Sequence, residues 1–369
     1  MSLLLSPFDL GTTTFRNRLW VAPMCQYSAV EGVPNDWHHV HLAQFASGGA
    51  GLVIAEATAV VPEGRISPGD TGLWNDAQRE AWAPIAGAIR ARGAVPGIQL
   101  AHAGRKASTF APFASERGSV PRDRGGWQTV APSAIAFEGL AEPAALDLAG
   151  IDAVVTAFAD AARRAAAAGF GVLEVHAAHG YLLHQFLSPL SNRRDDHYGG
   201  SLENRARLLL RVVEAVATAA PAATLFVRFS GTDWADGGWD VMQTATVASW
   251  AADRGAQFFD ISSGGLVAHQ QIRVGPGYQV PVAAQVRRLA GLPVSAVGEI
   301  TDGPQAEQIL QAGDADAVMA GREWLRDPHF ALRAATELGE PDAASWPQQY
   351  LRARPRAALA HDASAAVGR

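Results

Sequence analysis

Short apolar segments alternate with longer amphipathic segments along most of the chain. The apolar segments are rich in Val, Ile, Leu and Phe and are hydrophobic throughout, which is typical of strands buried on both faces of a parallel sheet. The segments between them have the spacing of amphipathic helices, and several end at a glycine. We predict strands at 19–23, 51–57, 97–101, 172–176, 225–229, 258–262, 294–298 and 317–320, and helices that include 76–92, 147–168, 202–219 and 279–290.

Eight strands, each followed by a helix, predict an α/β fold with a single (β/α)8 TIM barrel, which we assign to residues 1–342. The alternative, a doubly wound open sheet, needs a Gly-x-Gly-x-x-Gly turn after an early strand, and the chain has none there. Two polar segments, 107–131 and 188–201, are expected to be loops on the active-site face, and the first makes the third βα loop long. Residues 343–369 form a C-terminal tail whose end we expect to be disordered.

Composition excludes several classes of protein. With one cysteine among 369 residues, the chain cannot form an internal disulfide, a cysteine-ligated iron–sulfur cluster or a zinc ribbon. Its formal net charge of -6 argues against a basic surface for nucleic acid, and no apolar run approaches the length of a membrane span. The N-terminus lacks a basic start and a small-residue cleavage site, so we expect a cytoplasmic protein with neither a nucleic-acid nor a membrane partner.

In a barrel, the residues at the carboxyl ends of the strands face one opening. Here they form a chemically coherent set that contains amide and guanidinium donors, imidazoles, a phenol, a thiol and glycines. Its members are Pro23, Met24, Cys25, Tyr27, Glu56, Ala57, Gln99, His102, His176, His179, Tyr181, Arg228, Ser262, Ser263, Gly298, Gly321 and Arg322.

The glycines that follow the last two strands predict a phosphate site. Gly298 and Gly321 stand where barrels often bind phosphate through backbone N–H groups, and Arg322 would add a charged fork of donors. The alternative is that these glycines only allow tight packing. Gln99 and Arg228 are suited to hydrogen bond the polar edge of a ring, and an arginine beside a flavin pyrimidine stabilises the anionic reduced form.

His176 and His179 are spaced like a metal-binding pair, but two N–H donors aimed at one carbonyl or nitro oxygen suit a strand end better. A metal would need nearby carboxylate or thiolate ligands, and we expect Glu174 to point away, into the barrel or its shell. The pair could also be structural. Tyr181 is placed to protonate a carbanion-like centre, although a tyrosine with a satisfied hydroxyl that only packs is the common case. We expect no metal.

Three further histidines, His38, His39 and His41, fall on the first helical pattern and are interpreted as structural or surface residues.

These residues together resemble the Old Yellow Enzyme family of FMN-dependent ene-reductases, in its thermophilic-like branch. The resemblance runs from about Pro7 to Arg352, nearly the whole chain. Its strongest block is His176-Ala177-Ala178-His179-Gly180-Tyr181-Leu182. The other matching motifs are, in order, 15–18, 22–27, 56–60, 64–66, 99–106, 186–189, 192–193, 198–201, 203–205, 321–323 and 325–328.

The resemblance implies that the chain binds FMN and takes hydride from NADPH or NADH in ping-pong turnover. The second substrate would be a small-molecule activated alkene, such as an enone, a maleimide or a nitroalkene. The implied cofactor-binding residues are Ala22, Pro23, Met24, Cys25, Ala57, Gln99, His176, Arg228, Gly298, Gly321 and Arg322.

Substrate-binding roles are implied for Tyr27, Ile66, His176, His179, Tyr181 and Arg352. The two histidines would hold the electron-withdrawing oxygen, and Tyr181 would protonate the α-carbon after hydride reaches the β-carbon from flavin N5. Cys25, beside the flavin N5/O4 edge, would tune its potential, and with Tyr27 it completes the implied catalytic group.

In this branch an arginine near the C-terminus enters the neighbouring subunit's site, which implies a homodimer or homotetramer. Arg352 is our candidate, and Arg354 is a substitute for it. The long third loop contains Trp127, which we expect to shape the substrate entrance. The fused iron–sulfur dienoyl reductases, which share this barrel, are excluded because they need a cysteine cluster and additional domains.

Two other function classes remain open at this point. A phosphate-binding barrel aldolase or isomerase would share the site after the last two strands, and a Schiff-base version would have to use Lys106, the only lysine of the chain. A non-enzymatic flavoprotein is the other.

Overall fold

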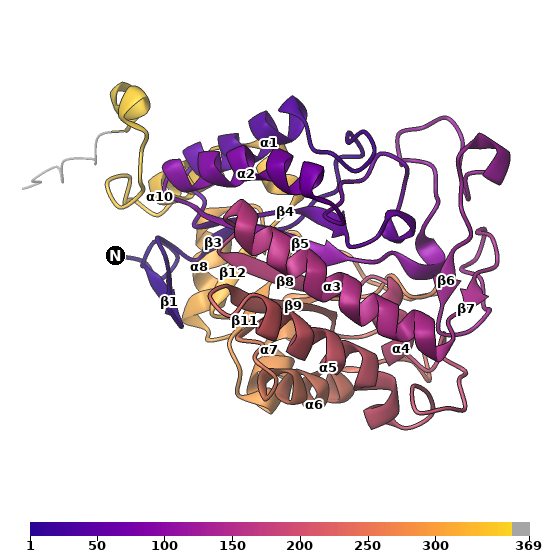
Figure 1. The fold of residues 1–369 in the computed structure, drawn as a ribbon. Coiled ribbons are helices and arrows are strands. Elements are labelled where there is room, and N and C mark those ends of the chain that lie inside the picture. Colours follow the sequence, from indigo (N-terminus) through magenta and orange to yellow (C-terminus); the bar gives the residue numbers. More distant parts are fainter. Residues whose placement is uncertain (356–369) are drawn as a thin grey trace, which may run out of the picture.

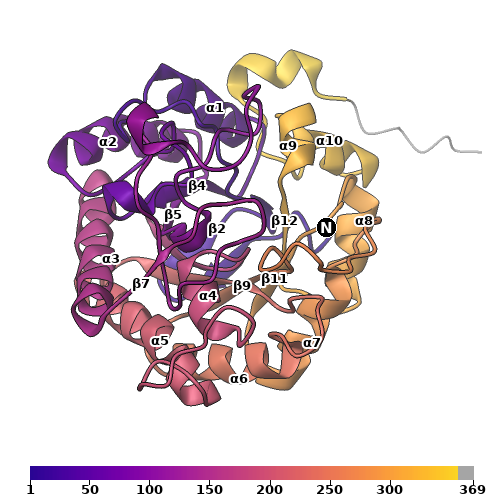
Figure 2. The ribbon, with the colours of Figure 1, turned by 90° about the vertical axis from the view of Figure 1, so that its right-hand side faces the viewer.

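The structure is a computed structural model that describes residues 1–355 of the chain. Eight parallel strands close into one barrel (Figure 2), which confirms the (β/α)8 prediction and rules out the open sheet. The strands follow one another around the barrel in the order of the sequence, and the last pairs with the first. They are β3 (Leu19–Val21), β4 (Leu52–Ala59), β5 (Val95–Ala101), β8 (Val172–Ala177), β9 (Thr224–Ser230), β10 (Phe258–Ser262), β11 (Val294–Ala296) and β12 (Ala317–Ala320).

Helices surround the barrel on the outside (Figure 2). The principal ones are α1 (Asp36–Ser47), α2 (Asp76–Ala91), α3 (Leu148–Ala168), α5 (Leu202–Ala219), α6 (Val241–Ala252), α7 (Val280–Ala290), α8 (Gly303–Gln311) and α10 (Phe330–Glu337). Two shorter helices, α4 (Leu182–Leu187) and α9 (Arg322–Arg326), follow β8 and β12. The helix bounds predicted from the apolar spacing therefore agree with the structure to within one or two residues.

Local sequence signals explain where these helices begin and end. Asn35 and Asn75 each accept a hydrogen bond from a backbone N–H in the first turn of the helix that follows, and the third helical residue bonds back to complete a capping box. α3 ends at Gly169, whose φ of 95° is the left-handed conformation that favours glycine.

An N-terminal hairpin fills the amino-terminal end of the barrel. It consists of β1 (Phe8–Leu10) and β2 (Thr13–Phe15), which pair antiparallel. Phe15 packs on Trp20 with ring centroids 4.7 Å apart, and Phe226 stacks on Phe258 at 4.6 Å. This aromatic group is buried, so polar side chains inside the barrel are confined to the part nearer the opposite, carboxyl-terminal opening.

Long loops surround that opening, as the polar segments predicted. The third βα loop carries η2 (Gly104–Lys106), η3 (Arg122–Arg124) and a two-stranded sheet of β6 (Val130–Ala131) and β7 (Ala144–Ala145), which lies at the right of Figure 1. Trp127 of this loop donates from Nε1 to the carbonyl of Glu63 over 2.8 Å, within η1 (Pro62–Gly64). The guanidinium of Arg65 lies 5.0 Å from the Trp127 ring centroid.

The last described element, η4 (Gln348–Ala353), lies on the side of the barrel opposite those loops (Figure 1). Trp346 and Tyr350 line a cavity together with Arg16 and Arg92, at the amino-terminal end of the barrel. Our expectation of disorder concerns the end of the tail, residues 356–369, which lies outside the described residues. Among residues 1–355, no helix combines the length and the hydrophobicity that a membrane crossing requires.

Candidate active site

Three rings from the end of β8 form the centre of the carboxyl-terminal opening. His176 is the fifth residue of β8, His179 follows in a left-handed conformation with φ 57°, and Tyr181 is the N-cap of α4. The His176 ring centroid lies 5.2 Å from that of His179 and 5.0 Å from that of Tyr181. The structure thus brings together the three residues on which the sequence-based mechanism depends.

Both imidazoles are neutral near pH 7. Burial lowers the pKa values of His176 and His179 well below the usual 6.5, and the positive charges of Arg228 and Lys106 lower them further. His179 Nε2 shares a 2.7 Å hydrogen bond with Ser262 Oγ, which orients the ring. His176 Nδ1 is buried and finds no hydrogen-bond partner among the described residues, so a ligand in the opening is its natural partner.

The phenol of Tyr181 is held in its protonated form. Burial raises its pKa well above 10, and Cys25, Tyr27 and Asp70 raise it further because each would be negative when ionised. Burial also raises the pKa of the Cys25 thiol well above its usual value, and Asp70 and Glu56 raise it further. The Tyr27 side chain hydrogen bonds with this thiol. Burial also raises the pKa of Asp70, to about 7. The Tyr181 phenol and the Cys25 thiol are therefore neutral near neutral pH.

A chain of hydrogen bonds supports the loop that carries Cys25 and Tyr27. Glu56 accepts from the backbone N–H of Gln26 and lies 3.0 Å from His38 Nε2. His38 Nδ1 accepts from the N–H of Asn35, so the ring proton is on Nε2. Of the three histidines on α1, His38 and His41 are buried and His39 is partly exposed, as expected of structural or surface residues.

A layer of buried polar side chains lies below the rings. Gln99 Nε2 donates to Glu174 Oε1 over 2.7 Å, and Arg228 pairs with Asp260 over 2.8 Å. Glu174 lies inside the barrel as expected, but strand alternation does not turn it away from the histidines. Glu174 and His176 are two positions apart on β8 and share a face, and only their different depth in the barrel separates them.

Beside this layer, a cavity of about 620 Å³ extends to the ends of β11 and β12. It is lined on one side by residues of the first strand and on the other by the glycines predicted to bind phosphate. Gly298 has φ 123°, and a Cβ at Gly321 would lie 3.4 Å from Met24 Sδ. The lining includes Ala22, Pro23, Met24, Arg228, Gly298, Gly321 and Arg322.

The residues of this cavity and layer fit a flavin mononucleotide. Arg228 lines the cavity, and Gln99 lies in the buried polar layer, where it donates to Glu174. Arg322 is an exposed cation of the cavity lining and lies 3.5 Å from Glu299. The buried His176 Nδ1 without a partner and the two glycines, where any side chain would narrow the cavity, agree with a planar ring and a phosphate. Within residues 1–355, no group of three or more metal-ligating side chains is assembled.

The remaining predicted residues are less central. Ala57 is buried near the carboxyl end of β4, and half-buried Ile66 lies in the loop after β4, where Asp70 accepts a 2.7 Å hydrogen bond from its N–H. Arg352 is exposed on η4 and does not reach the site of its own chain. Arg354 pairs instead with Asp342 over 3.0 Å.

Sequence reasoning missed several supporting residues. Gln279 Oε1 accepts a hydrogen bond from Ser263 over 2.6 Å and lies 3.2 Å from Ser262 Oγ, and Nε2 donates to the carbonyl of Val297. A buried pair, His184 and Asp233, lies behind the β8 turn. Gln279 gave no local signal, whereas His184 lies two residues after the 176–182 block and could have been singled out.

The comparisons with known proteins agree with this geometry. The model of the NADH:flavin oxidoreductase / NADH oxidase family matches residues 3–340. An NADPH dehydrogenase of Listeria monocytogenes is 46% identical over 356 residues, which cover 96% of this chain and 99% of the relative. An NADPH dehydrogenase of Geobacillus thermodenitrificans is 44% identical over 354 residues, which cover 95% and 98%.

Solved structures give the same result. Morphinone reductase superposes with a TM-score of 0.76 at 31% identity, covering 91% of this chain and 90% of that one. An Old Yellow Enzyme homologue from Zymomonas mobilis superposes with a TM-score of 0.75 at 28% identity, covering 96% and 99%. The chain therefore belongs to the NADH:flavin oxidoreductase / NADH oxidase family, the family of Old Yellow Enzyme, and is an FMN-dependent NAD(P)H oxidoreductase.

Proposed function

We propose that this oxidoreductase reduces activated C=C bonds of α,β-unsaturated carbonyl or nitro compounds. The observation that carries the proposal is the group of three rings, in which two neutral imidazoles lie beside one protonated phenol. Neutral N–H donors suit an oxygen that gains negative charge during the reaction, and a protonated phenol suits a carbon that must receive a proton.

Bound FMN would supply the hydride chemistry that connects NAD(P)H to the β-carbon of the alkene. Gln99 and Arg228 would hydrogen bond the polar edge of its ring, and Gly298, Gly321 and Arg322 would hold its phosphate. Arg228 pairs with Asp260 over 2.8 Å, and both side chains are buried, which fixes the direction of the guanidinium. Cys25, whose thiol stays neutral, would tune the reduction potential, and a shifted potential in Cys25→Ala would show it.

The chain's own residues would perform the remaining steps. His176 and His179 would bind the carbonyl or nitro oxygen, and Tyr181 would donate its phenolic proton to the α-carbon. Tyr27 and Ile66 would border the substrate. Trp127 supports this border from the third loop, because its ring lies against the guanidinium of Arg65, the residue before Ile66.

The aldolase alternative does not fit the site. A Schiff base needs the free amine of a lysine in contact with the substrate. Lys106 Nζ instead donates to two backbone carbonyls, those of His179 at 2.8 Å and Gly265 at 2.9 Å.

Half-reactions with the purified protein test the proposal. We expect a yellow protein whose flavin absorbance is bleached by NADPH or NADH without oxygen and restored by cyclohexenone. Rapid bleaching without restoration by an enone, a maleimide or a nitroalkene would confine the activity to NAD(P)H oxidation and contradict the proposed substrate class. Colourless protein that stays inactive after FMN is added would contradict the whole assignment.

We also propose that Arg352 completes the site of a neighbouring subunit in a homodimer or homotetramer that acts in the cytoplasm. Its exposed position at the far end of the barrel supports a role outside its own site.

A further inference from the structure

The peptide group between His179 and Gly180 is hydrogen bonded to one side chain at each end. Its carbonyl, that of His179, accepts from Lys106 Nζ over 2.8 Å, and its N–H, that of Gly180, donates to His184 Nδ1 over 2.9 Å. The peptide joins His179 to the residue before Tyr181, so its orientation affects the direction of both side chains.

This peptide group needs such support because its backbone is unusual. His179 and Gly180 have φ values of 57° and 72°, two consecutive left-handed residues. Gly180 is also obligatory here, because a Cβ would lie 2.2 Å from the carbonyl oxygen of Gly265. A turn of this kind persists only when the groups around it hold it in place.

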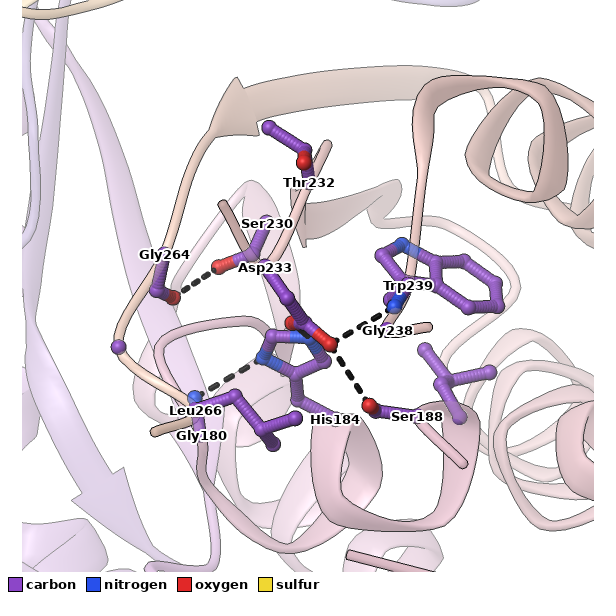
Figure 3. A network of polar contacts seen from close by, with 12 residues as sticks. Gly180, His184, Ser188, Ser230, Thr232, Asp233, Gly238, Trp239, Gly264 and Leu266 are labelled. Atoms are coloured by element: carbon purple, nitrogen blue, oxygen red, sulfur yellow. Dashed lines mark hydrogen bonds and ion pairs between the residues drawn. The ribbon is translucent and has the colours of Figure 1, made fainter. Parts of the chain in front are cut away.

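His184 is suited to this task by its partner on the other side (Figure 3). Because Nδ1 accepts from Gly180, the ring proton of the neutral imidazole is on Nε2, which lies 2.9 Å from Asp233 Oδ1. Asp233 Oδ2 accepts from Ser188 Oγ at 2.6 Å and from the N–H of Trp239 at 2.8 Å. His184 and Asp233 are both fully buried, so the pair fixes the tautomer that the Gly180 bond requires.

Lys106 holds the other end of the peptide and is half-buried. Besides the carbonyl of His179 it binds that of Gly265 over 2.9 Å, which connects the turn after β8 to the loop after β10. Its ammonium group lies 5.2 Å from the ring centroid of Tyr181 and 4.9 Å from that of Phe137. The only lysine of the chain is therefore used in binding backbone, beside the ring of the proposed proton donor.

We propose that Lys106 and the His184–Asp233 pair are positioning residues, which orient the His179–Gly180 peptide and so place the imidazole of His179 relative to the phenol of Tyr181. The inference rests on the proposed function, because it assumes that these two rings act on one substrate. A small displacement of a catalytic group slows a reaction strongly, so loss of either hydrogen bond should impair the steps that need both rings.

Two substitutions of His184 separate its two hydrogen bonds. In His184→Asn the amide can occupy the position of Nδ1 and accept from Gly180, but it does not reach Asp233. In His184→Gln the amide reaches Asp233 but leaves the Gly180 N–H without an acceptor. His197 is exposed and remote from the turn, so His197→Gln is the matched control.

The readouts are the rate constants of the two half-reactions and the affinity for a phenol. Phenol binding is measured from the long-wavelength absorbance band that a phenol forms with bound flavin. We expect His184→Gln to slow enone reduction and weaken phenol binding by about tenfold or more. Flavin reduction by NADPH should change much less. His184→Asn should remain nearer the wild type in both, even though it leaves the buried Asp233 without a partner.

Lys106→Met tests the other end of the peptide through a double-mutant cycle with His184→Gln. Because both side chains hold one peptide group, the loss of phenol affinity in the double variant should be clearly smaller than the sum of the two single losses in free energy. Additive losses would show that the two residues act separately and would overturn the inference.

A measurement without flavin separates this inference from the proposed function. In the flavin-free protein, hydrogen–deuterium exchange of a peptide that contains Gly180 should be faster in His184→Gln than in His184→Asn or His197→Gln. Equal exchange and equal phenol affinity in the two His184 variants would overturn the positioning role. Differences that follow only the thermal stability of the variants would overturn it as well. Failure of the protein to reduce any activated alkene, with the exchange difference present, would contradict the proposed function alone.

Discussion

Gln99 and Glu174 are joined by a 2.7 Å hydrogen bond between neighbouring strands inside the barrel, with the amide nitrogen as donor. The bond uses Nε2 of Gln99, so the amide oxygen is left to accept a hydrogen bond from a ring N–H of bound FMN. Burial raises the pKa of Glu174, and the charge of Asp260 raises it further, so this carboxyl favours its uncharged form. Glu174 therefore sets the direction of an amide rather than supplying a charge.

This relationship predicts different results for two substitutions of Glu174. Glu174→Gln keeps an acceptor of the same shape and should leave the affinity for FMN nearly unchanged. Glu174→Leu leaves the buried amide of Gln99 without its partner, which should weaken FMN binding by about tenfold. Titration of FMN into the flavin-free protein, followed by quenching of flavin fluorescence, measures both. Equal affinities for the two variants would contradict the orienting role.

Tyr181→Phe should slow alkene reduction by about 10²-fold or more, because the phenolic proton has no replacement donor in the proposed mechanism. Reduction of the flavin by NADPH requires no proton from this residue and should change little. Stopped-flow absorbance of each half-reaction distinguishes the two steps. A similar slowing of both would assign Tyr181 to binding rather than to proton transfer.

His102 predicts a component of acid destabilisation. Burial lowers the pKa of His102 from 6.5 to about 4, and its Nδ1 accepts from the N–H of Gly104 over 3.0 Å. Between these pH values the unfolded chain binds the proton and the folded chain does not, so stability falls as pH decreases from 6.5 to about 4. The difference corresponds to about 3 kcal/mol of folding free energy.

His102→Asn keeps an acceptor for Gly104 but cannot titrate. Its stability, measured by chemical denaturation, should therefore fall less than that of the wild type over the same pH range. Other buried histidines, such as His41, titrate in both proteins and cancel in the comparison. A constant difference between the two proteins at all pH values would rule out His102 as the source.

The proposed role of Arg352 predicts complementation between two impaired subunits. A mixed dimer of Tyr181→Phe and Arg352→Ala contains one site with both native residues and one site with neither. Enone reductase activity should therefore rise when the two variants are dissociated and reassembled together, compared with either alone. Arg354→Ala in place of Arg352→Ala is the control. Absence of any gain in a confirmed oligomer would show that Arg352 does not act across subunits.

Sequence patterns predicted the barrel because each buried strand is a short, continuous apolar run between amphipathic helices. They also placed His176, His179, Tyr181, Gln99 and Arg228 around one opening, because the carboxyl ends of parallel strands meet there. That prediction depended only on where each strand ends, and a strand end can be recognised from the local sequence.

The supporting contacts could not be read from sequence in the same way. Lys106 is conspicuous in the sequence as the only lysine, but its partners are backbone carbonyls of two distant loops, which no pattern encodes. Asp233 meets His184 only because the loop after β9 folds beneath the turn after β8. The left-handed backbone at His179 is equally invisible, because a non-glycine residue adopts it only when tertiary contacts hold it there.

The aromatic side chains that fill the amino-terminal end of the barrel have a kinetic consequence. They close the amino-terminal end of the barrel, so a nicotinamide and the proposed alkene would both reach the site through the carboxyl-terminal opening. In the proposed reaction the two would compete for the same volume, and release of the first product would precede entry of the second substrate. A hairpin far from any reacting atom would thereby influence the order of events in the catalytic cycle.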